Sequence, residues 1–203
     1  PDHGMPLGGF GAGCLGRSPS GAFNLWNLDG GEHWFGSIPD CQFALWEQQG
    51  EDVRAHALAT APDRDDTDPS GGTPLSAWQW YPASTQGRST GTYAARYPLS
   101  WTHHEDVYRA GVLCEAFSPI LPGDYQRTSY PVAVFRWQFS NPTDQPLELS
   151  LLLCWRNTVG WFTNTDAAAE VHFRDDGSPE HNYAPAIGRG EGQRNRQVDQ
   201  PGL

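Results

Sequence analysis

Acidic, imidazole and aromatic side chains gather in one glycine-rich stretch, LDGGEHWFG at residues 28–36. Carboxylates accept hydrogen bonds from sugar hydroxyls, and an aromatic ring can stack on the C–H face of a sugar, so this composition fits a carbohydrate contact. A surface loop with an aromatic lid has the same composition and is the simpler alternative. The residues predicted for a substrate cleft or an interdomain surface, from this loop and the hairpin before it, are Arg17, Trp26, Asp29, Glu32, His33 and Trp34.

The sequence GAGCLG at residues 11–16 matches the G-x-G-x-x-G pattern of dinucleotide-binding turns. That mechanism needs a strand before the glycines and a helix after them, because the helix amino terminus meets the pyrophosphate. Here Pro19 and Gly21 follow within a few residues and would break a helix. The pattern therefore predicts glycines that permit close backbone approach or positive φ. No nucleotide or other cofactor is expected.

A second cluster, HHED at residues 103–106, has the residue types of a metal site. On a strand, His103 and Glu105 share one face, while His104 and Asp106 share the other. Two ligands on a face fall short of the three protein ligands that a catalytic zinc needs. We therefore expect a solvated hairpin end and no metal. The sequence also shows no G-x-S-x-G elbow and no other activated nucleophile.

Charge and composition exclude several functional classes. The chain contains no Lys, which excludes a Schiff-base lysine and a Walker lysine. Its net charge of −11 argues against nucleic-acid binding, which needs a basic face. No stretch reaches the about 18 apolar residues of a membrane span, and no signal peptide is visible. The four cysteines have neither zinc-site nor disulfide-framework spacing, so we predict free thiols in a cytoplasmic protein.

The elements that hold these residues are predicted to be β-strands. The 23 Gly and 17 Pro, together 40 of 203 residues, leave little room for long helices. Apolar residues alternate at odd positions from 147 to 155 and from 133 to 139, so each run predicts a strand with one face on a core. The turn cluster NPTDQP at 141–146 lies between them and predicts an antiparallel hairpin.

Turn residues between other apolar runs predict the remaining strands. SPSG and QQGED each separate two such runs and predict two more hairpins. Together these signals predict an all-β fold, a two-sheet antiparallel β-sandwich over residues 1–175, followed at 176–203 by a polar loop or linker or by the start of the rest of the sandwich. The other expected strands are 14–17 with 22–28, 41–47 with 53–59, 77–81, 93–101 and 107–117.

Three segments resemble a known family. They are PLGGFGAGCLGR with the following GAFNLW, then YPLSW at 97–101, and then SPILPGDYQRTSYPVAVF at 118–135. Their order and spacing resemble the N-terminal domain of the non-lysosomal glucosylceramidase (bile-acid β-glucosidase) family, glycoside hydrolase family 116. The resemblance is strongest over residues 5–163.

The resemblance implies a two-domain retaining β-glucosidase that hydrolyses β-glucosides or glucosylceramide. In that family a β-sandwich packs on a C-terminal (α/α)6 barrel, which holds the carboxylate nucleophile and the acid/base. We expect this chain to lack the barrel and the end of the sandwich, so no catalytic residue is assigned to it. Its implied partners are the barrel and, through the barrel, the glucoside. The alternative is a stand-alone carbohydrate-binding or scaffold sandwich without catalysis.

Overall fold

The computed structural model describes residues 3–28, 33–62, 79–84, 87–156 and 158, together with the short strands 172–173 and 179–180. Almost all regular structure in these residues is β-strand, which confirms the predicted all-β sandwich. One helical turn, α1 (Tyr125–Thr128), interrupts the strands. No helix in the described part of the chain is long and apolar enough to cross a membrane.

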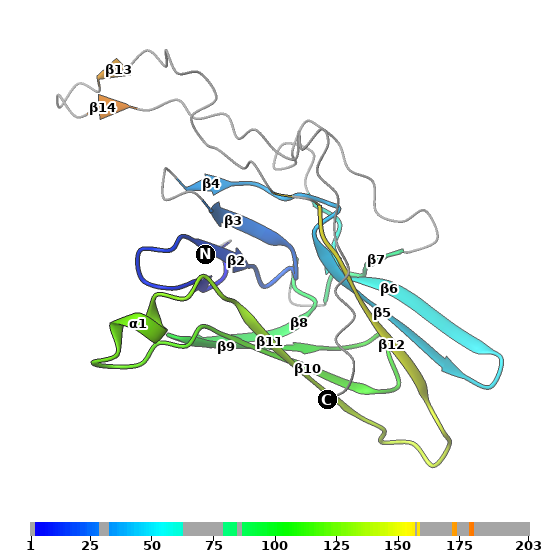
Figure 1. The fold of residues 1–203 in the computed structure, drawn as a ribbon. Helices are drawn as coiled ribbons and strands as arrows, with labels where there is room; N and C mark the ends of the chain where they lie inside the picture. The colour runs from blue at the N-terminus through cyan, green and yellow to red at the C-terminus, as the bar shows by residue number, and fades with distance from the viewer. Residues whose placement is uncertain are drawn as a thin grey trace, which may run out of the picture. The chain divides into compact units, whose positions relative to one another are not determined.

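Residues 1–155 form one unit with three four-stranded sheets, and residues 156–203 form a second unit (Figure 1). We name the sheets of the first unit in chain order. The first sheet has the order β1 (Pro6–Leu7), β2 (Cys14–Arg17), β3 (Phe23–Asn27) and β4 (Trp34–Phe35). The second has the order β12 (Glu148–Cys154), β5 (Gln42–Gln49), β6 (Asp52–Thr60) and β7 (Gln79–Tyr81). The third has the order β11 (Val134–Ser140), β10 (Gly111–Phe117), β9 (Leu99–His104) and β8 (Gly91–Arg96).

In the second unit, the described residues are the antiparallel strands β13 (His172–Phe173) and β14 (Pro179–Glu180). In the first unit every pairing is antiparallel except that β7 lies parallel to β6.

An aromatic layer joins the second and third sheets. Phe43 on β5 meets Phe135 and Trp137 on β11, with ring centroids 5.1 and 5.0 Å apart. Phe23 on β3 adds the first sheet to this layer, because its ring lies edge-on to those of Phe135 and Trp155 at 5.6 and 5.1 Å. Phe23 and Phe43 are buried and Phe135 and Trp137 are half-buried, so this layer packs the three sheets of the unit against one another.

The hairpins predicted around short turns are confirmed. β2 pairs with β3 across SPSG, and β5 pairs with β6 across Gly50 and Glu51. The predicted strand at 93–101 is instead a hairpin, because the chain turns at Tyr97 and Pro98 between β8 and β9. Apolar and polar residues continue to alternate through this turn, so the pattern did not reveal that the chain reverses direction there.

The predicted hairpin of β11 with β12 is wrong. β11 pairs with β10, and β12 pairs with β5, so the connection crosses from the third sheet to the second (Figure 1). In that connection the Asn141 side chain accepts hydrogen bonds from the backbone and hydroxyl of Thr143 at 2.9 and 2.7 Å. Gln49 of β5 also donates to the Thr143 hydroxyl at 3.0 Å. These bonds shape a wide arch between sheets, not a tight turn.

β12 is also less buried than its pattern predicts. Leu151, Leu153 and Trp155 on the alternating apolar face are 39, 50 and 36% exposed. β12 and β11 are edge strands, and the described residues leave this side of the two sheets partly open.

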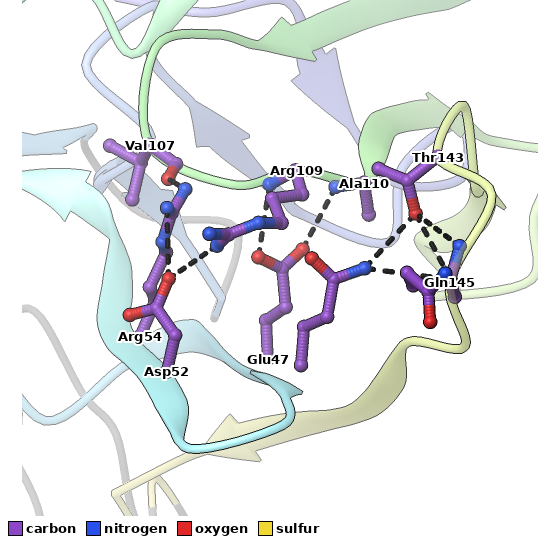
Figure 2. Close-up of polar contacts among 9 residues, drawn as sticks. Glu47, Asp52, Arg54, Val107, Arg109, Ala110, Thr143 and Gln145 are labelled. Carbon is purple, nitrogen blue, oxygen red and sulfur yellow. Dashed lines mark hydrogen bonds and ion pairs between the residues drawn. The ribbon is translucent and has the colours of Figure 1, made fainter.

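The strand predicted from residue 107 begins only at Gly111. Before it, the backbone N–H groups of Arg109 and Ala110 donate to the Glu47 carboxylate at 2.9 and 2.8 Å (Figure 2). A buried charged acceptor therefore takes the two donors that a continued strand would have used in a ladder.

Glycines supply a close backbone approach within the first sheet, as predicted from GAGCLG, and another between the first and second sheets. Gly13 has φ +79°, and a Cβ there would lie 2.2 Å from the carbonyl oxygen of Asn27. Gly21 has φ +86°, and its Cβ would lie 2.0 Å from the carbonyl oxygen of Leu58. Strand β2 follows the glycines and a turn follows β2, so the helix of a dinucleotide site is absent there.

Candidate functional site

Arg17 lies where the three sheets meet. It ends β2, at a bulge between Gly16 and Arg17, and its side chain is only 4% exposed. One terminal nitrogen donates to the carbonyl of Leu58 on β6 at 2.8 Å and lies 3.5 Å from Nε2 of His104 on β9. The guanidinium also lies 5.7 and 5.5 Å from the rings of Phe43 and Trp137. Arg17 therefore lies in the interior and links the three sheets.

No carboxylate compensates Arg17 among its hydrogen bonds and ion pairs to described residues. Burial lowers the pKa of its guanidinium from the usual value. Burial, followed by the charge of Arg17, holds the pKa of His104 well below the usual value for imidazole. His104 is therefore neutral at physiological pH, and its Nε2 can accept from Arg17.

The HHED cluster lies at the surface as predicted, except for His104, which is buried. His103 and Glu105 are neighbours at the surface, with Nδ1 and Oε1 3.2 Å apart. His104 is buried and packs between the rings of Tyr81 and Trp137, at 5.4 and 5.8 Å. The expectation of a solvated end is therefore wrong for His104, because the inward face of β9 belongs to the core. Within the described residues, no group of three or more His, Cys, Asp or Glu could hold a metal ion.

Trp26 is also a core residue. Its side chain is fully buried on β3, and its indole N–H donates to the carbonyl oxygen of Gly36 at 2.8 Å. Its ring lies 6.4 Å from that of Trp34, the residue opposite it on β4. Trp26 therefore holds the β4 segment in place and supports the surface beyond it.

The exposed part of the candidate site lies at the end of the first sheet. His33 is exposed, and its ring stacks on that of Phe35 at 6.1 Å with an interplanar angle of 16°. Phe35 is 53% exposed and also touches the ring of His3 at 4.5 Å. We call this surface the β4 aromatic surface and define it as His3, His33 and Phe35; it combines an apolar ring with two imidazoles.

His33 also contacts two strands of the same sheet. Its Nε2 lies 3.8 Å from Sγ of Cys14 on β2, and its Nδ1 lies 3.4 Å from Nδ2 of Asn27 on β3. From the predicted set, the structure places Trp34 against Trp26, leaves His33 exposed beside Phe35, and buries Arg17 in the interior. Asp29 and Glu32 lie outside the described residues.

The described buried carboxylates have structural partners. Glu47 holds the loop before β10, as described above. Glu115 accepts from the indole of Trp101 at 3.0 Å and forms an ion pair with Arg136. These two groups stabilise loop and strand positions.

The exposed Asp52 bridges Arg54 and Arg109 (Figure 2), and the hydrogen bond from Arg109 is the main cause that lowers its pKa. A glycosidase acid needs a raised pKa, so Asp52 does not fit that role.

Sequence reasoning missed Glu47, Cys14 and Asn27. Cys14 and Asn27 are opposite partners in the β2–β3 hairpin, so pairing the strands around SPSG would have brought them together. Glu47 lies on a strand that was predicted, but no local signal shows that it caps a loop sixty residues away.

One comparison with known proteins identifies the family. The family model described as "beta-glucosidase 2, glycosyl-hydrolase family 116 N-term" matches residues 4–199. The match covers nearly the whole chain, including all three sheets of the first unit. The chain therefore belongs to the family of N-terminal domains of family 116 glycosyl hydrolases.

Proposed function

We propose that this chain is the N-terminal sandwich of a retaining β-glucosidase that acts on β-glucosides or glucosylceramide. Its role is to support a separate catalytic (α/α)6 domain, which supplies the two catalytic carboxylates. The observation that carries this proposal is the family match over residues 4–199. We also propose a cytoplasmic location, because the four cysteines lack the spacing of a disulfide framework.

The contacts of the buried charged groups favour a structural role for this chain over a catalytic one. The buried Glu47 and Glu115 each satisfy structural donors, and a retaining mechanism needs two free carboxyl groups about 5–5.5 Å apart on either side of a sugar. Arg17, which ties the sheets, lies in the same interior. These buried charged side chains of the described interior therefore stabilise the sandwich.

We propose the β4 aromatic surface as the contact with the catalytic domain or as one wall of the substrate cleft. Phe35 is an exposed aromatic on an edge strand that the buried Trp26 fixes from below. Rigid exposed aromatics are common at the centres of interfaces, where their truncation typically costs about 2 kcal/mol or more.

The test is association with the catalytic domain expressed separately, measured by titration calorimetry. Phe35→Ser should weaken binding at least about tenfold, whereas Tyr97→Ser, an equally exposed aromatic on the β8–β9 turn, should leave it unchanged. Equal affinities for both variants would remove the β4 aromatic surface from the interface. No association of the unaltered chain would contradict the supporting role itself.

The exposed rings of the β4 aromatic surface also favour a second candidate, a stand-alone carbohydrate-binding module. In that case the chain alone should bind a β-linked gluco-oligosaccharide, and Phe35→Ser should abolish the binding. Binding of the sugar without association to a catalytic domain would favour this candidate over the first.

A further inference from the structure

Three buried polar atoms without a partner belong to one cluster of side chains. They are Nε of Arg17, Nδ1 of His104 and Nε1 of Trp137, none of which has a hydrogen-bond partner among the described residues. Arg17 and His104 are each only 4% exposed, and Trp137 on the edge strand β11 is half-buried. Buried polar groups in proteins are nearly always paired, so three unpaired atoms in one cluster need an explanation.

Each side chain of this cluster contacts the other two. Nη2 of Arg17 lies 3.5 Å from Nε2 of His104, and the guanidinium lies 5.5 Å from the centroid of the Trp137 ring. The imidazole of His104 stacks on the Trp137 ring, with centroids 5.8 Å apart and an interplanar angle of 24°. The three unpaired atoms therefore belong to neighbouring groups, which come from β2, β9 and β11.

All three unpaired atoms are hydrogen-bond donors. Nε of Arg17 and Nε1 of Trp137 each carry a hydrogen. Because Nε2 of the neutral His104 accepts from Arg17, the hydrogen of this imidazole is on Nδ1. The cluster therefore lacks an acceptor. A water molecule fits it poorly, because water accepts about two hydrogen bonds and brings two hydrogens that need acceptors of their own.

The cluster also carries a positive charge that its neighbours among the described residues do not balance. A guanidinium stays protonated in proteins, so Arg17 is charged in the interior. It contacts the carbonyl oxygen of Leu58 at 2.8 Å and the ring of Phe43 at 5.7 Å, both of which are neutral. Burial raises the pKa of the nearby Cys114 thiol, so this group is also neutral. A buried charge without a counter-charge is far more costly than a buried neutral group, so an anion would stabilise this cluster.

We propose that the cluster of Arg17, His104 and Trp137 binds one chloride ion, which accepts hydrogen bonds from the three unpaired N–H groups. A single negative charge balances the single guanidinium, whereas a divalent anion would leave a buried negative charge. A monoatomic anion accepts from several directions, whereas a carboxylate brings about four lone-pair sites, more than three donors can fill. The bound ion joins the first sheet to the third, and this role is separate from the proposed support of a catalytic domain.

The test is urea unfolding of the full chain at constant pH and ionic strength, with sodium chloride replaced stepwise by sodium gluconate. Gluconate has the same charge as chloride but is too bulky for a buried site. One ion bound only by the folded chain should raise the folding equilibrium constant about tenfold for each tenfold increase in chloride above its Kd. Equal unfolding midpoints in chloride and in gluconate would overturn the proposal.

A matched pair of arginine variants separates the site from general salt effects. Arg17→Met should remove the dependence on chloride, because it removes both the charge and one of the donors. Arg127→Met changes the net charge of the chain equally, but Arg127 is exposed and pairs with Asp124, so the dependence should remain. A dependence on chloride that persists in Arg17→Met would contradict the site.

Two further measurements decide the proposal if Arg17→Met does not fold. Trp137→Phe removes one N–H and keeps an aromatic ring, so chloride should bind about tenfold more weakly. In crystals grown with bromide, an anomalous peak should lie within hydrogen-bonding distance of Arg17 Nε, His104 Nδ1 and Trp137 Nε1. An ordered water at that position, no peak there, or an unchanged half-saturating chloride concentration in Trp137→Phe would overturn the proposal.

Discussion

Replacing Glu47 by Gln tests the structural role assigned to the buried carboxylates. Glu47 is 1% exposed, and its two oxygens accept from the backbone N–H groups of Arg109 and Ala110 at 2.9 and 2.8 Å. Gln has the same shape but offers one oxygen and one N–H₂ group. One of the two backbone donors therefore loses its acceptor and meets another donor.

The expected loss is about 2–4 kcal/mol of unfolding free energy. A hydrogen bond to a charged group contributes about 1.5–3 kcal/mol, and a buried donor left without a partner costs about 1–3 kcal/mol. Removal of the charge also relieves its desolvation cost, which sets the lower end of the range. The whole stability of a domain is only about 5–15 kcal/mol, so the change should be easily measured.

The assay is urea unfolding followed by tryptophan fluorescence, with Glu51→Gln as the control. Glu51 is an exposed turn residue between β5 and β6, so its change should be within about 0.5 kcal/mol. An unfolding midpoint for Glu47→Gln equal to that of Glu51→Gln would refute the role assigned to Glu47.

Three further predictions concern the core. His104 binds a proton more readily in the unfolded than in the folded chain, so the stability that it contributes should be present above about pH 6.5 and decline below that pH, by up to about 1.4 kcal/mol per pH unit. His104→Gln should remove this decline when urea unfolding is measured at several pH values. The same decline in the variant and in the unaltered chain would contradict the role assigned to His104. Leu45→Asp should abolish soluble expression, because Leu45 on β5 is fully buried. Leu151→Asp should not, because Leu151, the residue opposite Leu45 on β12, is partly exposed. Equal yields of the two variants would show that the burial of β5 is wrongly assigned. Trp26→Phe should lower the unfolding free energy by about 1–3 kcal/mol, because it leaves a buried carbonyl without its indole donor, and an unchanged melting temperature would contradict that bond.

The sequence was sufficient for the hairpins around SPSG and QQGED, but not for the reversal at Tyr97 and Pro98. Short turns such as SPSG join β2 to β3, and the register follows from alternation and turn length. The connection after β11 also has turn-forming residues but joins two sheets, because β12 pairs with β5, about a hundred residues earlier. Such non-local pairing leaves no mark in the local pattern.

The candidate site was predictable only in part. The motif that contains Arg17 and Trp26 marked a structurally important hairpin, but alternation alone did not show that both side chains lie in the interior. His33 was predicted, whereas its contact with Cys14 depends on the return of β4 beside β3. The residue types indicated a polar and aromatic surface, whereas the contact of His33 with Cys14 follows only from the pairing register of β2, β3 and β4.

The measurement that tests the central claim most directly is hydrolysis of an aryl β-glucoside by the purified 203-residue chain. The chain is proposed to support catalysis by another domain, so it should show no turnover alone, and activity should be present when the catalytic domain is supplied in the same polypeptide or added to it. Turnover by the chain alone that persists through purification and is lost on a single substitution within it would contradict the account.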